Sequence, residues 1–186
     1  MMRPALGPPA PELRDDRAAI VLRPWRNSDA QSLVAAWLDP AITAHCGVPS
    51  DAGFDRAVKW ITGWSERTAW GVALDLVVAD VETDEVLGEV GLWPFVAPPN
   101  SAAVPGVLEL GWWMGAAHRG AGRASVAVRL VAEWALRVAA ARRVVARIPS
   151  GHASSEAVAR RAGLARRGSV DSEHALWVRS AATMSP

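Results

Sequence analysis

One stretch of the sequence, residues 107–138, constrains the fold more than any other. It begins with an apolar segment rich in Leu and Trp, and a glycine-rich turn follows at residues 118–124. The apolar residues after the turn recur at every fourth position: Val126, Leu130, Trp134 and Val138. Because a spacing of four marks one side of an α-helix, the stretch predicts a strand, a tight turn and a helix in succession.

The turn also has the composition of an anion-binding loop. A helix start leaves backbone N–H groups without acceptors and carries partial positive charge, so it attracts phosphate. Gly120 and Gly122 would let the backbone approach a ligand closely, and Arg119 and Arg123 would add charge. The same residues also fit a plain entry into a helix. The sequence lacks the Gly-Lys-Ser/Thr of a nucleoside-triphosphate loop and the third glycine of a dinucleotide-binding loop.

Three motifs in order resemble the GNAT acyltransferases. Residues 119–124, RGAGRA, match the family's R/Q-x-x-G-x-G/A loop, and residues 108–114, LELGWWM, resemble the strand before that loop. Residues 151–164, GHASSEAVARRAGL, resemble the G-N-x-x-S-x-x-V-x-x-K-x-G-F segment of the branch that acetylates ribosomal-protein N-termini, the RimJ/RimL-like enzymes. The resemblance covers about residues 19–179.

The resemblance implies a fold and a co-substrate. The expected fold is α/β, with a single mixed, mostly antiparallel central sheet flanked by helices, over residues 18–186 after a flexible N-terminal tail at 1–17. The expected co-substrate is acetyl-CoA, with no metal. Its pyrophosphate would be held by the loop residues Arg119, Gly120, Ala121, Gly122, Arg123 and Ala124. Its pantetheine arm would meet the backbone of Trp113 and Met114 and the side chains of His152 and Ser155.

Charge and composition narrow the partners. Residues 1–114 hold 8 basic and 15 acidic side chains, whereas residues 115–186 hold 12 and 4. A basic half beginning at the loop suits a polyanionic co-substrate, and an acidic half suits an amine. The arginines follow no nucleic-acid-binding motif, so we expect no nucleic-acid partner.

No apolar run reaches the length of a membrane span, and the N-terminus lacks the apolar core of a secretory signal. We therefore expect no membrane partner and a cytoplasmic location. The single cysteine, Cys46, excludes an internal disulfide framework and a multi-cysteine metal site. A homodimer is left open.

Acetyl transfer to an amine needs a base and a proton for the departing thiolate. Glu109 is the first candidate base, because it lies among apolar strand residues whose desolvation would raise its pKa. The alternative is a carboxylate satisfied by a cross-strand arginine, and Glu89 is the reserve base. The family's usual tyrosine acid is missing, since the chain has no tyrosine. The resemblance puts Ser155 in that place, with a helix N-cap as its alternative role. His152 stands where the family usually has Asn, which puts the pantetheine contact in question.

The remaining elements follow from periodicity and turn residues. We expect helices around residues 33–37 and 54–64, which the resemblance puts over the acceptor site, and a hairpin of residues 70–81 and 86–93. An irregular, proline-rich loop is expected at 94–106. A strand at 142–149, a helix at 154–162 and two final strands at 164–170 and 175–180 would complete the domain.

The predicted activity is direct acetyl transfer from acetyl-CoA to a primary amine, on a peptide N-terminus or a small molecule. Two alternatives remain at this point. One is a non-catalytic, regulatory acyl-CoA binding module, and the other is an acyltransferase with a longer donor such as succinyl-CoA.

Overall fold

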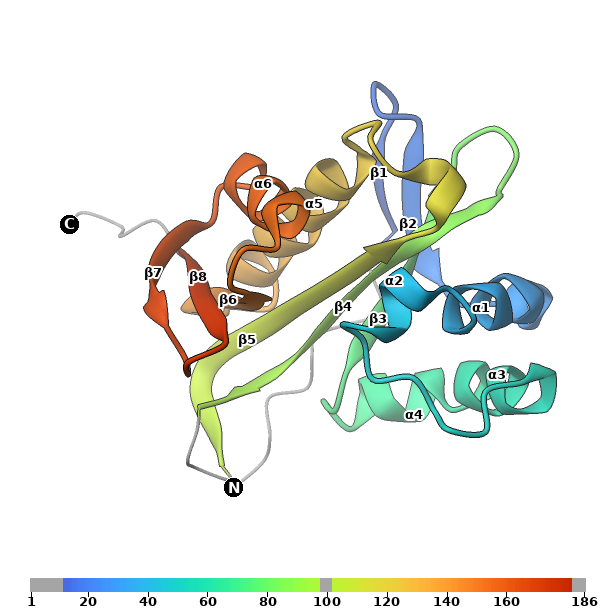
Figure 1. The fold of residues 1–186 in the computed structure, drawn as a ribbon, viewed down its shortest axis with the longest axis horizontal. Coiled ribbons are helices and arrows are strands. Elements are labelled where there is room, and N and C mark those ends of the chain that lie inside the picture. The colour runs from blue at the N-terminus through green and yellow to red at the C-terminus, as the bar shows by residue number, and fades with distance from the viewer. Residues whose placement is uncertain (1–11, 98–101, 182–186) are drawn as a thin grey trace.

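A computed structural model of the chain describes residues 12–97 and 102–181. It confirms the predicted α/β class: one mixed, mostly antiparallel eight-stranded sheet has helices on both faces (Figure 1). The strand order is β1-β2-β3-β4-β5-β6-β8-β7, and only the pairing of β5 with β6 is parallel. The strands are β1 (Leu13–Asp15), β2 (Ile20–Pro24), β3 (Leu74–Asp80), β4 (Val86–Val96), β5 (Ala103–Met114), β6 (Arg143–Pro149), β7 (Ala165–Ser169) and β8 (His174–Ser180).

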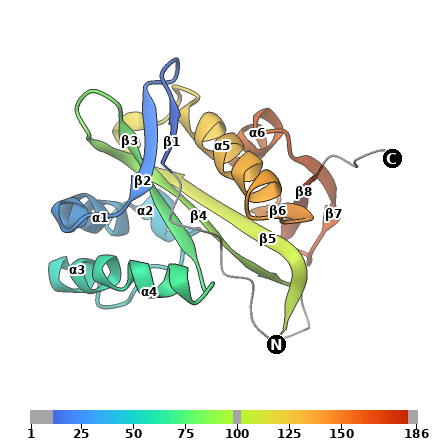
Figure 2. The same cartoon turned by 180° about the vertical axis from the view of Figure 1, so that it is seen from behind.

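The helices divide between the two faces of the sheet. On one face lie α1 (Ala30–Trp37), α2 (Pro40–Thr43), α3 (Phe54–Thr62) and α4 (Trp64–Ala69), and on the other lie α5 (Arg123–Arg137) and α6 (Ala153–Arg161). Figure 2 shows the same division from behind. Short 3-10 turns precede α1 (η1, Asn27–Asp29) and α5 (η2, Ala116–His118). No helix among the described residues has both the length and the apolar character needed to cross a bilayer.

The N-terminal region is more ordered than the sequence predicts. Residues 1–11 of the expected tail lie outside the described residues. Leu13–Asp15, however, forms β1 and pairs antiparallel with β2. An ion pair between Asp15 and Arg129 of α5, at 3.0 Å, ties this edge strand to the helix beneath it. The polar, proline-rich composition concealed a strand that is stabilised by pairing and by this contact.

The predicted irregular loop at 94–106 is largely wrong. Residues 98–101 lie outside the described residues, but β4 continues to Val96 and β5 begins at Ala103. Pro94 pairs with Leu108, and the register shifts between Pro94 and Val96. Proline removes only one ladder donor and its fixed φ suits extended backbone, so a strand can pass through it at an irregularity.

The predicted central hairpin forms, but with a later start. β3 begins at Leu74 because the helix α4 ends at Ala69 and residues 70–73, the expected beginning of the strand, form the turn after it. Asp75 and Val77 of β3 pair with Gly91 and Glu89 of β4. This register places the carboxylates Asp75 and Glu89 on the face of the sheet that α1–α4 cover.

Helix α5 confirms the predicted helix, although its buried side differs from the predicted stripe. The face turned to the sheet consists mainly of small residues: Ser125, Ala127, Val128, Val131, Ala132, Trp134 and Ala135. Val126 and Leu130 are only half-buried, and Val138 is exposed. Steps of four residues drift around a helix of 3.6 residues per turn, so alanines set the buried face here.

Two main apolar cores result, one on each side of the sheet, and a small third cluster consists of Phe95, Val107 and Val145. The larger packs α5 and α6 against the strands, and the smaller packs α1 and α3 against β3. At the centre of the smaller core Trp25, Leu33, Ala57 and Val77 are buried. Beside it, Arg23 and Asp29 form a buried ion pair at 2.8 Å that joins β2 to the start of α1.

Candidate active site

Strands β5 and β6 pair at only three positions and then separate. Residues 107–109 pair with 143–145, whereas β5 continues to Met114 and β6 to Pro149. The opposite edge of β5 is paired with β4 as far as Met114. Within the described residues, the edge of residues 110–114 that faces β6 therefore has no strand partner. A free backbone edge of this kind can pair with an extended ligand.

The glycine-rich loop follows this free edge directly. Gly120 has φ +85° and Gly122, the N-cap of α5, has φ +77°, values that favour glycine. A side chain added at either position would meet nothing within 4 Å, so backbone conformation, not crowding, requires the glycines. Ser125 N–H donates to Gly122 O at 3.0 Å. The earlier N–H groups of this first turn have no acceptor within the helix and point toward its positive end.

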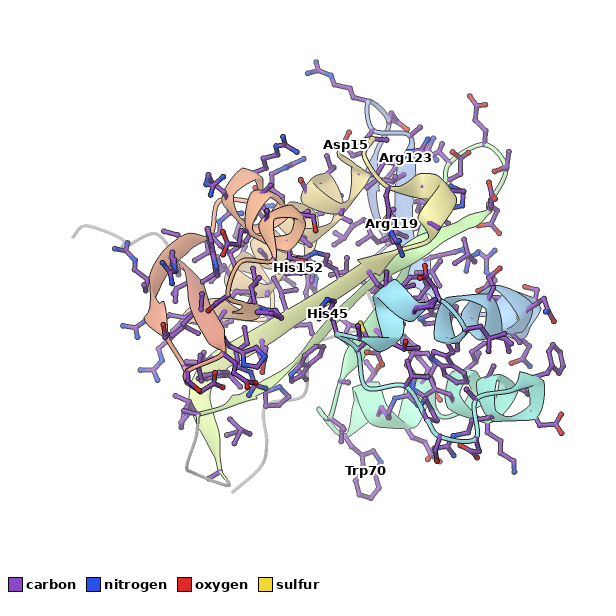
Figure 3. The ribbon with its side chains drawn as sticks, in the orientation of Figure 1. Asp15, His45, Trp70, Arg119, Arg123 and His152 are labelled. Carbon is purple, nitrogen blue, oxygen red and sulfur yellow. The ribbon has the colours of Figure 1, made fainter. Side chains whose placement is uncertain are left out.

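The two arginines of the loop are bound to the protein. Arg119 donates from Nε to Met114 O at 2.9 Å and from its terminal nitrogen to Asp39 at 2.5 Å. Arg123 lies 3.5 Å from Asp80 at the end of β3. Hydrogen bonds from Ala41 N–H and Arg119 keep the pKa of Asp39 below its usual value, despite some desolvation. Both arginines therefore fix the loop against neighbouring elements, as their positions in Figure 3 show.

A cavity of about 700 Å³ opens beside the free edge of β5. Its walls come from α1, α2 and the loop after α2 on one side, and from β6, the start of α6 and the β7–β8 turn on the other. Its floor is the β4–β5 pair, including Glu89, Glu109 and Trp113. Sequence-predicted residues from distant parts of the chain thus meet in one place.

Glu109 is held by a pair of hydrogen bonds from an arginine. Arg147 donates from Nε at 2.6 Å and from a terminal nitrogen at 2.9 Å, one bond to each carboxylate oxygen. Trp93 adds an indole N–H at 3.1 Å, and the residue is only 4% exposed. This arrangement matches the alternative interpretation of Glu109, a carboxylate satisfied by a cross-strand arginine.

Glu89 has a different environment on the same floor. Trp25 and Trp113 donate indole N–H groups to its two oxygens, at 3.0 and 3.3 Å. Burial, together with the nearby carboxylate of Asp75, raises the pKa of Glu89 to about 8. A carboxyl with this pKa exchanges protons near neutral pH, as a general acid or base must.

His152 contacts His45 across the cavity. The ring centroids lie 4.5 Å apart in an edge-to-face arrangement, with His45 on the loop after α2 and His152 at the N-cap of α6 (Figure 3). Burial, with a smaller contribution from His45, lowers the pKa of His152. Its Nδ1 is buried and has no hydrogen-bond partner among the described residues. A neutral imidazole with a spare nitrogen can bind a ligand group by hydrogen bonding.

Ser155 lines the cavity from the first turn of α6. The alternative role as N-cap is wrong, since His152 occupies that position and α6 has no side-chain cap. Cys46 also lines the cavity, and burial followed by the charge of Glu89 raises the pKa of its thiol to about 11. The thiol is therefore protonated at neutral pH.

Sequence reasoning did not identify several cavity residues. Arg147, Asp171 and His174 line the cavity, and His174 Nδ1 lies 2.9 Å from Asp171. Only the parallel register of β5 and β6 brings Arg147 beside Glu109, and no local sequence pattern encodes that register. Within 12–97 and 102–181, no group of three or more His, Cys, Asp or Glu side chains is arranged to hold a metal ion.

Solved structures share the overall fold. The S5-alanine acetyltransferase of Vibrio fischeri gives a TM-score of 0.74 at 15% identity, over 90% of this chain and 96% of that one. RimJ of Mycobacterium smegmatis, solved with CoA-disulfide, gives 0.68 at 18% identity, over 92% and 86%. An acetyltransferase of Agrobacterium tumefaciens gives 0.68 at 23% identity, over 91% and 94%.

No curated protein sequence matches the chain. The model of one protein family, described as the acetyltransferase (GNAT) domain, matches residues 19–165 and so covers most of the chain. That span contains the separating strands, the glycine loop and both candidate carboxylates. The chain therefore belongs to the GNAT acetyltransferases.

Proposed function

We propose that this protein transfers an acetyl group from acetyl-CoA directly to a primary amine, with no covalent enzyme intermediate. The observation that carries the proposal is the free edge of residues 110–114, which the short turn η2 and the glycine loop connect to the N-terminus of α5. One continuous backbone surface thus offers hydrogen bonds first to an extended amide chain and then to a diphosphate. CoA has these two parts in this order.

The residues present fit CoA on two counts. Beyond the pairing with β6, the free edge of β5 offers backbone groups to the pantetheine amides. In the loop, Gly120 and Gly122 put no side chain in front of the first-turn N–H groups, and residues 119–124 would enclose the diphosphate. His152 Nδ1, which needs a partner, and the hydroxyl of Ser155 line the cavity next to this surface.

Acetyl-CoA supplies a thioester whose carbonyl carbon an amine nitrogen can attack. In the proposed reaction Glu89 removes the proton from the amine, the new C–N bond forms and the C–S bond breaks. Ser155 donates its hydroxyl hydrogen bond to the departing sulfur. We prefer Glu89 to Glu109, the first candidate from the sequence, because the charge of Glu109 already meets the guanidinium of Arg147. Glu109 stays an alternative that substitution can test.

The acceptor is an amine that enters from the side of α1–α3. The structural neighbour from Vibrio fischeri is a ribosomal-protein-S5-alanine acetyltransferase, so a peptide N-terminus is one source of such an amine. A small-molecule amine is the other.

The first test combines acetyl-CoA binding with release of free CoA thiol in the presence of peptide and small amines. Ala121→Glu places a carboxylate in the exposed loop, so we expect the Kd for CoA to rise about tenfold or more through charge repulsion. Ala35→Glu, on an exposed position of α1, is the matched control and leaves the Kd unchanged.

Saturable binding without thiol release from any amine would contradict the transferase proposal and favour a binding module. An unaltered Kd in Ala121→Glu would contradict the placement of the diphosphate. Succinyl-CoA, compared with acetyl-CoA under one acceptor, tests the choice of donor.

A further inference from the structure

The acceptor side of the cavity is built largely from indole rings. Trp37, Trp60, Trp93 and Trp113 line it from α1, α3, β4 and β5. Leu33, Ile42, Val48 and Pro49 add apolar surface to that side, beside Thr43, His45 and Cys46. A surface of this kind recognises shape and apolar area more than it recognises polar groups.

Protein carboxylates already occupy the polar atoms of two of these rings. Trp113 N–H donates to Glu89 at 3.3 Å, and Trp93 N–H donates to Glu109 at 3.1 Å. These bonds also fix the orientation of each indole. What remains for a ligand is the aromatic surface of the rings, held rigid before binding.

Trp60 belongs to a cluster of indole rings around the carboxyl of Glu89. Its ring packs edge-to-face on Trp25 with centroids 5.7 Å apart, and Trp25 lies 6.4 Å from Trp113. The guanidinium of Arg67 lies 4.3 Å from the centroid of the Trp60 ring. Trp25 and Trp113 both donate to Glu89. An amine that reaches Glu89 therefore arrives among aromatic rings.

The charges of the cavity favour an acceptor with a single amine. Among the described lining residues, Glu109 is paired with Arg147, and Asp171 accepts hydrogen bonds from the backbone N–H groups of Glu173 and His174. Glu89 is the acidic group of the floor that receives only neutral indole donors. A diamine or an amine with a cationic side chain would bring a second charge into an apolar wall, where an unpaired charge is costly.

We propose that the acceptor is a monoamine carried on an apolar, aromatic body, with its nitrogen at Glu89 and its ring against Trp60 and Trp113. This inference rests on the proposed function and specifies its substrate class. The aromatic body can belong to a free aromatic amine, or it can be the side chain of an apolar N-terminal residue of a peptide. Both present the same chemistry to the cavity.

The test uses amino-acid amides, which share one α-amine and differ in side chain. With acetyl-CoA saturating, kcat/KM from thiol release is measured for the amides of Phe, Leu, Ser and Lys. We expect Phe amide to exceed Ser amide by about tenfold or more, the scale of one well-packed aromatic contact, and Lys amide to be lowest. Tripeptides that begin with Phe or Ser distinguish a peptide source from a free amine by their absolute kcat/KM.

Variants then test whether the preference depends on the indole wall, the surface formed by Trp37, Trp60, Trp93 and Trp113. Trp60→Leu lowers the Phe to Ser ratio by about tenfold, whereas Trp60→Phe retains most of it because a ring remains. Trp70→Leu is the matched control, since Trp70 is 75% exposed at the end of α4 and points away from the cavity (Figure 3). A circular-dichroism spectrum and acetyl-CoA affinity equal to wild type show that each variant is folded.

Each outcome decides between the proposals. Thiol release at similar kcat/KM for all four amides contradicts the acceptor inference and leaves the transferase proposal standing. A preference that persists in Trp60→Leu contradicts the role of the indole wall. Thiol release with other amines but with none of these amides and tripeptides contradicts the acceptor inference alone, whereas absence of release with every amine contradicts the proposed function and the acceptor inference with it.

Discussion

Glu89 and Glu109 lie on one sheet floor but differ in the groups that bind them. Glu109 accepts two hydrogen bonds from the guanidinium of Arg147, whereas Glu89 accepts only indole N–H groups and has Asp75 nearby. Burial and that neighbouring carboxylate raise the pKa of Glu89 to about 8. The same residue type thus acquires two chemical characters from its partners.

The pH dependence of activity follows from Glu89. Its carboxylate form increases as pH rises through about 8, so kcat/KM should rise across that range and level off above it. In Glu89→Gln this limb disappears and turnover falls by about a hundredfold, the scale of a general base. Profiles measured with acceptors whose amine pKa values differ separate the ionisation of Glu89 from the ionisation of the amine. A limb lost instead in Glu109→Gln would move the base to Glu109.

Stability provides a second readout with the opposite slope. Between the usual carboxyl pKa of 4.5 and about 8, the unfolded chain is ionised at this residue while the folded chain keeps the proton. The folded state then binds more protons than the unfolded state. The contribution of Glu89 to the free energy of unfolding therefore decreases as pH rises. The free energy of unfolding of Glu89→Gln should lack this decrease, which denaturant titrations at several pH values would measure.

At the level of elements, a buried ion pair joins β2 to α1. Arg23 donates to both oxygens of Asp29, at 2.8 and 3.1 Å, and each residue is about 5% exposed or less. Asp29 also accepts from Arg26 N–H at 2.8 Å at the start of the helix. The pair thereby sets where α1 leaves the sheet, and α1 forms one wall of the cavity.

We expect Asp29→Asn to lower the free energy of unfolding by about 2 kcal/mol, because it removes the buried counter-charge of Arg23 and leaves that guanidinium only the half-exposed Asp84, at 2.7 Å. Asp16→Asn is the matched control: its pair with Arg14 is exposed, and such pairs contribute less than about 1 kcal/mol. Urea denaturation of the two variants measures the difference. Equal losses in both variants would show that burial of the Arg23 pair contributes nothing.

Local patterns predicted most of the elements around the site. The glycine loop and the helix after it follow from short-range rules on φ and helix starts, and the structure places them as expected. The buried side of α5 was misjudged because alanines, which stand out little in a periodicity analysis, pack closest to the sheet. Strand Leu13–Asp15 escaped prediction because its order depends on pairing with β2 and on Arg129, far along the chain.

The site was predictable only in part, for a similar reason. The sequence brought Glu109, Glu89, Ser155 and His152 forward as candidates, and all four line one cavity. Which carboxylate carries a counter-charge depends on the parallel register that pairs Glu109 with Val145 and so brings Arg147, two residues farther along β6, within reach of Glu109. The contact of His152 with His45 joins opposite walls. Neither register nor wall separation has a local signature in the sequence.

Across the whole molecule, the short parallel pairing of β5 and β6 has a mechanical consequence. Three positions on each strand are the only sheet contact that joins β1–β5 to β6, β8 and β7 among the described residues. A ligand bound between β5 and β6 beyond these positions would contact both parts of the sheet and hold them together.

By mass action, free CoA that binds only the folded chain should add about 2.7 kcal/mol to the free energy of unfolding at a hundredfold excess over its Kd, or about 5–10 °C in melting temperature for a chain of this size. Differential scanning calorimetry measures the gain, and Ala121→Glu should require more CoA to reach it. A melting temperature that did not change with CoA would contradict binding of the co-substrate to the folded chain. If the gain is observed, the enzyme is most stable with its donor bound, and the donor then contributes to holding the two parts of the sheet together.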